Sequence, residues 1–302
     1  GAVYGFPTKY ENSRWILINE DMFKEAGLDI PYDGWTYSEF LADAEKLTHG
    51  EGQDKVSGVC WARKQSGKSI LYALDGVLGA NQIYKNEEGT EVNFDNDVYR
   101  AGLNLVKETL DKGYAIPIED EFSEDISVAN TFLQGKCAIM LGVAQMRLCM
   151  DQENYPHDFM TALVPAPVPD DEKYNTEFYR KQIGTTGAGD LLSISANTKY
   201  PEASFEFAMW YLKGGMSPLV QGGRIPLWNG VNKDEVLSVL KEKAQGSIDM
   251  DSMENYLSLD TTQGVAAIKG NASSEISSAW FEEFDAMCYG KQSVDQTVQN
   301  ME

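Results

Sequence analysis

Phe132-Leu-Gln-Gly-Lys-Cys-Ala-Ile-Met-Leu141 sets the fold class of this chain. A helical pattern that begins at Asp125 ends before Gly135, and glycine can take the left-handed conformation with which helices end. The following run, Cys137–Leu141, is apolar at every position, as expected for a strand that is buried on both faces. The stretch therefore predicts a helix that leads into an interior strand.

The same alternation of helix and strand signals recurs along the chain. A capping box formed by Thr36 and Glu39 opens a helix through Leu47. An apolar run at Leu191–Ser195 leads into a helix that starts at Pro201, a residue that suits the first helical turn. Alternating units of this kind are typical of an α/β fold with a mostly parallel sheet. Helices are also expected at 96–110, 234–243, 273–287 and 294–301.

Composition narrows the class of protein further. The 302 residues are 42% apolar, which is enough for one large or two medium domains with their own cores. The formal net charge of -22 repels phosphate backbones and anionic lipids, so we expect no nucleic-acid partner and no direct membrane binding. No run approaches the roughly 20 apolar residues of a membrane span, and the start at Gly1 carries no export signal.

The four cysteines are too few and too scattered for a disulfide scaffold. We expect all four, Cys60, Cys137, Cys149 and Cys288, to act as small buried hydrophobic residues, with a Cys137–Cys149 bridge as the local alternative. No cluster of cysteine and histidine suggests zinc, so neither a metal nor a cofactor is expected.

Signatures of common enzymes are missing from the sequence. It contains no GxSxG, Walker loop, HExxH or GxGxxG motif, and its only histidines, His49 and His157, lie in polar surroundings. Acidic pairs such as Glu282 and Glu283 are neighbours whose side chains diverge, which favours solvated surfaces. Because two carboxylates at a suitable separation can hydrolyse glycosides, a carbohydrate-active enzyme stays as the alternative to a binding protein.

Polar and aromatic residues gather in one loop near the start of the chain. Tyr10, Glu11, Asn12 and Arg14 fall between two expected strands, 4–7 and 15–18. Sugars are bound by planar hydrogen-bonding groups on their hydroxyls and by aromatic faces against their C–H groups, and these residue types supply both. A charged exposed turn explains the pattern equally well.

Two later loops share this character. The first, Gly184–Asp190, offers Thr185, Thr186 and Gly187 just before an apolar run, and its glycines would let a ligand approach the main chain. The second carries Arg224 and Trp228 on an extended segment. A plain connecting loop and a packed Pro-Trp corner are the respective alternatives.

The order of these segments resembles the family 1 extracellular solute-binding proteins of ABC importers, the group that includes maltose-binding protein. The clearest likeness is Glu20-Asp-Met-Phe-Lys-Glu-Ala-Gly-Leu-Asp29, which is similar to the family's Y-N-K-D-L-F-K-K-A-G-L-D stretch. No single landmark is highly specific, but together they cover nearly the whole chain in order. The others are Gly5–Pro7, Trp35–Phe40, Phe132–Ile139, Ser193–Leu212, Gly223–Pro226 and Gly290–Val294.

The resemblance implies a periplasmic-binding-protein-like α/β fold of type II, with two lobes joined by crossing strands. The family opens with a βαβα unit that nothing before Gly1 supplies, so the first lobe is expected to be incomplete. Residues 1–11 and 189–232 would form the remainder of that lobe and the hinge, and residues 12–188 and 233–302 the second lobe. Apolar surface exposed by the missing unit would favour a dimer.

The resemblance also assigns residues to the site. The family's acidic ligand contact matches Glu11, with Tyr10 and Asn12 beside it. The family's sugar-stacking tryptophan falls at Gln145, so one stacking platform is lost here. Trp228 or Trp280 would have to compensate, although the pattern around Trp280 favours a core position.

The function that the resemblance implies is reversible binding of a sugar or oligosaccharide for uptake, with ABC permease subunits as partners. Such a protein would be lipid-anchored at the surface of a Gram-positive cell or lie in the periplasm of a Gram-negative one. Two alternatives remain, namely the carbohydrate-active enzyme and a binding protein for a solute that is not a sugar.

Overall fold

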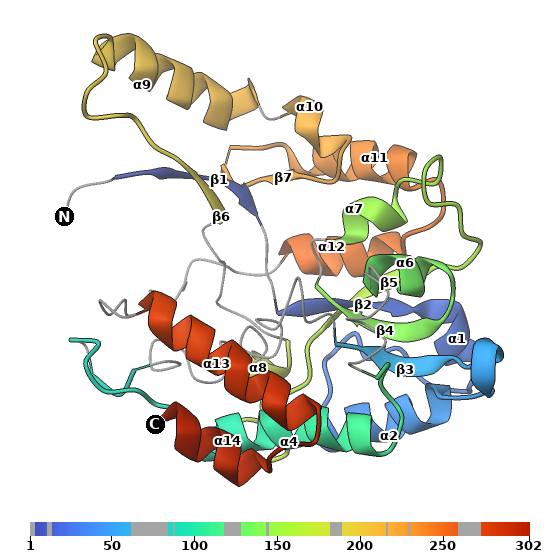
Figure 1. Ribbon diagram of the computed structural model, residues 1–302. Coiled ribbons are helices and arrows are strands. Elements are labelled where there is room, and N and C mark those ends of the chain that lie inside the picture. Colours follow the sequence, from blue (N-terminus) through green and yellow to red (C-terminus); the bar gives the residue numbers. More distant parts are fainter. Residues whose placement is uncertain are drawn as a thin grey trace.

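The described strands form two separate sheets, seen in the computed structural model of Figure 1. The larger sheet has four strands and is covered by helices on both faces, whereas the smaller one has three strands. The structure describes residues 4–10, 14–61, 84–86, 88–117, 128–142, 145–181, 189–215, 217–228, 230–258 and 273–302.

The larger sheet confirms the interior strand predicted from the sequence. Its order is β3 (Ser57–Cys60), β4 (Cys137–Leu141), β2 (Trp15–Asn19), β5 (Thr161–Pro165). All five residues of β4 are buried, and so are all five of β2.

The prediction of a mostly parallel sheet is wrong, because most neighbouring strands of the larger sheet pair in the antiparallel direction. Only β3 and β4 pair in parallel, because β2 is antiparallel to both β4 and β5. Strands β3, β4 and β5 therefore all run one way and β2 runs the other way. The reason is that β2 enters directly from the smaller sheet, without the crossover helix that parallel neighbours need.

Alternating residues of β2 build the cores on the two faces of this sheet. Ile16 and Ile18 belong to one core cluster, and Trp15 and Leu17 belong to the other. This period of two is what a pleated strand imposes. The first cluster is closed by α2 (Tyr37–Leu47), α4 (Asp97–Asp111), α13 (Ser273–Cys288) and α14 (Val294–Met301). The second is closed by α6 (Val128–Leu133), α7 (Met146–Cys149), α11 (Lys233–Ala244) and α12 (Met250–Ser258).

The smaller sheet has β1 (Phe6–Tyr10) between β6 (Gly189–Leu192) and β7 (Ile225–Pro226), antiparallel to both. Helix α9 (Pro201–Trp210) follows β6, and the ring centroids of Phe205 and Phe6 are 6.1 Å apart. A π-helical turn, Tyr211–Gly215, and the short α10 (Ser217–Val220) lead from α9 towards β7.

Helix starts follow the sequence signals. Thr36 and Glu39 form the reciprocal capping box at the start of α2, and Asn96 and Asn232 accept backbone N–H bonds at the starts of α4 and α11. Gly135 has φ +67° after α6, although the predicted start of that helix at Asp125 lies outside the described residues. The described residues also form three short helical elements, namely α1 (Glu20–Glu25), the 3-10 turn Gly52–Asp54 and α8 (Glu177–Arg180).

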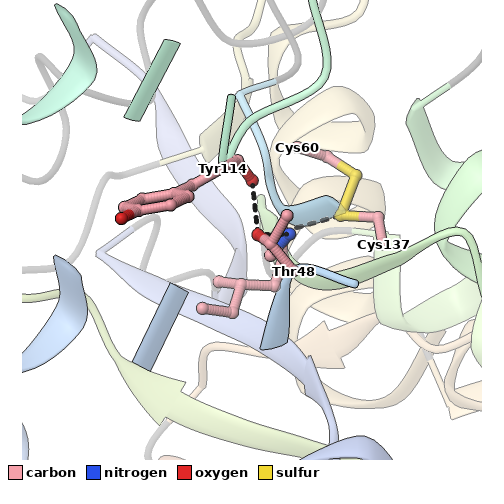
Figure 2. Close-up of a disulfide and its surroundings, with 6 residues drawn as sticks. Thr48, Cys60, Tyr114 and Cys137 are labelled. Atoms are coloured by element: carbon pink, nitrogen blue, oxygen red, sulfur yellow. Dashed lines mark hydrogen bonds between the residues drawn. A yellow bond between two sulfur atoms is a disulfide. The ribbon is translucent and has the colours of Figure 1, made fainter. Parts of the chain in front are cut away.

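The expectation for the cysteines needs correction. Cys60 of β3 and Cys137 of β4 form a disulfide with Cα atoms 6.2 Å apart (Figure 2). Close to it, the Thr48 hydroxyl lies 3.4 Å from the Tyr114 carbonyl oxygen. The Cys137–Cys149 alternative is wrong, because Cys149 is a free and buried thiol. A separation of 77 residues hid the actual partner, which only the pairing of strands brings near.

Candidate functional site

The end of β1 is the centre of the candidate site. Because β1 is antiparallel to both neighbours, its last residues lie beside the first residues of β6 and β7. Lys9 pairs with Gly189, and Tyr10 pairs with Ile225. These residues from three distant parts of the sequence therefore meet at one end of the smaller sheet.

Described residues that flank each of the three polar segments singled out from the sequence lie at this end of the sheet. Residues 11–13 lead from β1 to β2 of the larger sheet, residues 182–188 lead into β6, and Arg224 directly precedes β7. The predicted ligand residues Glu11, Asn12, Thr185, Thr186 and Gly187 lie outside the described residues. What the structure brings together is the flanking backbone of each loop.

Arg14 and Gln145 lie at the end of the larger sheet where β2 begins and β4 ends. Arg14 precedes β2 and Gln145 follows β4, and the pairing of Ile16 with Leu141 places these two strand ends side by side. Arg14 is 4% exposed, and its carbonyl oxygen accepts the Ala166 N–H at 2.7 Å. Gln145 is half-buried at the start of α7, where its side chain makes no capping bond.

Helix α7 also contacts the segment that precedes β7. Gly223 has φ +74°, and a Cβ atom there would lie 3.1 Å from the Arg147 Cβ and 2.6 Å from the Met150 Cε. Only glycine satisfies both this backbone conformation and this close approach. The contact places the exposed Arg224 next to α7 and adds Arg147 to the candidate site. The sequence reasoning missed Arg147, and its place two residues after Gln145 was the available signal.

The two tryptophans that were expected to compensate for Gln145 lie elsewhere. Trp228 is three residues beyond Ile225, so it lies towards the opposite end of β7 from Arg224. Its ring packs on Gly230 at a pocket of about 210 Å³ that Lys213 and Glu235 also line. Trp280 is 1% exposed and stacks on Phe284 with ring centroids 4.7 Å apart. The core interpretation of Trp280 is confirmed, and its buried ring offers no open face for stacking on a sugar.

The segments that meet at the junction carry residues of both charges. Lys9, Arg14, Arg147 and Arg224 are basic, and Glu11 and Asp190 are acidic. Guanidinium groups donate several N–H bonds in a fixed plane, which suits hydroxyl, ring and carboxylate oxygens. Among the described residues, no group of histidine, cysteine, aspartate and glutamate side chains is arranged to hold a metal ion.

The architecture is the periplasmic-binding-protein-like α/β fold. It has two sheets, of which the larger is covered by helices on both faces, and three chain segments meet at one end of the smaller sheet. Solved structures with this fold match nearly the whole chain. A sugar transporter from Rhizobium etli in an open conformation has a TM-score of 0.67 and 17% sequence identity, over 99% of this chain and 71% of its own. An ABC substrate-binding protein from Listeria monocytogenes in complex with cycloalternan has a TM-score of 0.68 and 16% sequence identity. The match covers 99% of this chain and 69% of the Listeria protein.

A third similar structure is an ABC transporter solute-binding protein from Agrobacterium vitis with bound D-mannitol. Its TM-score is 0.64 at 17% identity, over 100% of this chain and 71% of its own. The fold here is thus partial relative to these longer proteins. Among curated protein sequences, none matches the chain.

The sequence signature of bacterial extracellular solute-binding proteins matches residues 1–213. The chain belongs to this family, whose members bind solutes and are not enzymes. It is thus a solute-binding protein. A search of the described helices finds none with the length and apolar character of a membrane span.

Proposed function

We propose that this protein reversibly captures a sugar or small oligosaccharide for import. The observation that carries the proposal is the meeting of Tyr10, Gly189 and Ile225 at one end of the smaller sheet. Three polar loops start or end there, and a site that lies where chain segments pass between two layers can open and close on a ligand. Relatives described as a sugar transporter or as bound to cycloalternan or D-mannitol support the choice of ligand class.

The proposed ligand contacts come from both sheets. Tyr10, Glu11 and Asn12 would form hydrogen bonds from the first crossing, and Thr185, Thr186 and Gly187 from the second. Arg224 would add a contact from the smaller sheet, and Arg14 and Gln145 would complete the site from the larger sheet. We leave Trp280 out because its ring is already stacked on Phe284 in the core, and we place Trp228 outside the site.

The proposed lobes follow the sequence division. Residues 1–11 and 189–232 would form the first lobe and hinge, and residues 12–188 and 233–302 the second lobe. This division leaves β1, β6 and β7 in the first lobe and β2, β3, β4 and β5 in the second. Closure of one lobe on the other would bury the ligand and give permease subunits a recognisable closed form.

The proposed location is the outer side of the cell membrane. It would be reached by a lipid anchor in a Gram-positive cell or by the periplasm in a Gram-negative one. Permease subunits of an ABC importer would take the solute from the closed protein.

A thermal-shift panel tests the ligand class. We expect cycloalternan, D-mannitol, acarbose or a related sugar to raise the unfolding temperature, while polyamines, peptides and phosphorylated solutes leave it unchanged. A ligand at 100 times its dissociation constant adds about 2.7 kcal/mol to the free energy of unfolding. A shift with a non-sugar solute alone would contradict the proposed class.

Two variants that flank β7 separate the proposed site from its surroundings. Arg224→Gln removes a donor at the end next to Tyr10 and is expected to abolish the sugar-induced shift. Trp228→Ala, beyond the opposite end of β7, serves as the matched control and is expected to keep the shift. Hydrolysis of a nitrophenyl glycoside that disappears in Glu11→Gln would instead establish the enzymatic alternative.

A further inference from the structure

Residues 166–181 form a segment that joins two parts of the proposed site, and we call it the α8 strap. The strap begins at Ala166, whose N–H donates to the Arg14 carbonyl oxygen at 2.7 Å. It ends at Lys181, directly before the second crossing, residues 182–188. The place of Lys181 therefore sets the point at which the second crossing begins.

Backbone bonds at the start of α2 hold the first half of the α8 strap. Val168 donates its N–H to the Trp35 carbonyl oxygen at 3.0 Å and accepts the Tyr37 N–H at 2.8 Å. The Asp170 carboxylate accepts the N–H of Ser38 at 3.3 Å. These bonds hold the strap up to Asp170 and leave its second half to other contacts.

Arg180 holds the second half of the strap. Its Nη2 atom donates to the Gly34 carbonyl oxygen at 2.5 Å and lies 3.2 Å from the Glu39 carboxylate. Its Nη1 atom donates to the Asn175 side-chain oxygen at 3.0 Å. The backbones are also close, because Gly34 has φ +79° and a Cβ atom there would clash with the Arg180 carbonyl oxygen. One planar guanidinium group thus joins α8 to the start of α2.

We infer that Arg180 is a positioning residue for the proposed ligand site, a role that depends on the proposed function. It acts through the predicted contacts Thr185, Thr186 and Gly187 of the second crossing and not by touching the ligand. A loop that is already held in its binding position loses less conformational freedom when the ligand arrives. A firm attachment just before the loop therefore raises affinity.

Replacement of Arg180 is expected to leave the fold intact. Tyr174 and Tyr179 of the α8 strap pack against the core of the larger sheet, and they stay in place without the guanidinium group. The ion pair between Arg180 and Glu39 is partly exposed, and exposed ion pairs contribute little to stability. Loss of this contact is thus expected to change the position of the second crossing more than the stability of the protein.

Amide NMR spectra of the deuterated, ¹⁵N-labelled chain test the positioning without any ligand. Arg180→Gln is expected to shift the amide signals of residues 185–187. Arg180→Lys keeps the charge but not the planar fork, so it is expected to shift them less. Lys181→Gln is the matched control, because Lys181 is nearer to these residues in sequence and its ion pairs with Asp33 and Glu177 are exposed. This control is expected to leave the signals in place.

Glu39→Gln separates the contact with Arg180 from the capping of α2. The amide oxygen of the new side chain can still accept the Thr36 N–H, but the charge that faces Arg180 is lost. We expect a smaller shift of the signals of residues 185–187 than in Arg180→Gln, and little further shift when both changes are combined, because both act on one contact. Fully additive shifts would contradict this shared contact.

Titration with cycloalternan, D-mannitol and acarbose measures the effect on binding. Arg180→Gln is expected to weaken the binding of the sugars that the wild-type chain binds by about three- to tenfold, while Lys181→Gln keeps it. Unchanged affinity in Arg180→Gln would overturn the positioning role. So would signals of residues 185–187 that stay in place in this variant or move equally in the control. A wild-type chain that binds none of these sugars would count against the proposed function instead, and the amide signals would still decide the role of Arg180.

Discussion

The two sheets of this protein differ in how completely their side chains are covered. Every residue of β2, β4 and β5 in the larger sheet is buried, since helices close both of its faces. Helix α9 beside the smaller sheet is also rich in apolar residues, yet Ala208 is its only buried residue. Apolar side chains are therefore covered around the larger sheet and exposed on α9.

The largest expected contrast comes from removing one aromatic ring in each region. Phe40 on α2 is fully buried, so Phe40→Ala is expected to lower the free energy of unfolding by about 3–5 kcal/mol. Phe205→Ala on α9 is expected to cost less than about 1 kcal/mol, since half of that side chain is already exposed. Urea unfolding of dilute samples measures both values, and equal losses would show that α9 is covered after all.

Helix capping gives a second, smaller contrast. Thr36→Ala removes the capping box of α2 and is expected to cost about 1 kcal/mol, whereas Thr36→Ser keeps it. Tyr200 makes no side-chain capping bond at the start of α9, so Tyr200→Ala is expected to leave stability unchanged in dilute samples. Thermal unfolding of the three variants compares the two helices, and a loss at Tyr200 as large as that at Thr36 would contradict this difference.

The partly buried carboxyl of Asp43 on α2 is expected to make the stability of the protein depend on pH. Burial raises the pKa of its carboxyl to about 6, against roughly 3.9 in an unfolded chain. Below about pH 4 the group is protonated in both states, and stability is lost as the pH rises through 6 because the folded protein must ionise a partly buried acid. Asp43→Asn is therefore expected to stabilise the protein at neutral pH by about 0.5–1 kcal/mol after solvent screening.

Unfolding of this variant and the wild type at acidic and neutral pH measures that effect. The advantage of the asparagine should vanish near pH 4, where the wild-type carboxyl is already neutral. An advantage of the same size at both pH values would assign it to packing and not to ionisation.

Thiol labelling gives the mildest contrast, because it changes no packing. Burial raises the pKa of the Cys149 thiol to about 12, which leaves almost no thiolate to react at neutral pH. Cys288 is only half-buried and is expected to be labelled first. Alkylation followed by peptide mass spectrometry ranks the two residues, and faster labelling of Cys149 would contradict its burial.

Sequence patterns predicted the elements of the larger sheet well because local signals determine them. The capping box at Thr36, the stop at Gly135 and the apolar run Cys137–Leu141 each act within a few residues, and each is found in the structure. The direction of β2 was not predictable in this way, since strand pairing depends on residues far apart in the sequence. The Cys60–Cys137 disulfide was missed for the same reason.

The candidate site was predictable as a set of loops but not as a geometry. Residue types at Tyr10, Arg14 and Arg224 indicated polar binding loops, but only the register of β1 against β7 shows which of them are neighbours. Trp228 had a suitable side chain, and its distance from Tyr10 along β7 became evident only from that register. The contact of Gly223 with Arg147 joins segments 76 residues apart and left no local signal.

A glycan array probed with the labelled chain tests most directly whether the junction at the end of β1 captures sugars. We expect the wild-type protein to bind a subset of the glycans and to be released by the free sugar, which leaves the glycans intact. We expect Arg224→Gln to abolish this binding and Trp228→Ala to keep it. A folded wild-type protein that retains no glycan, or one that cleaves those it binds, would contradict the proposed function.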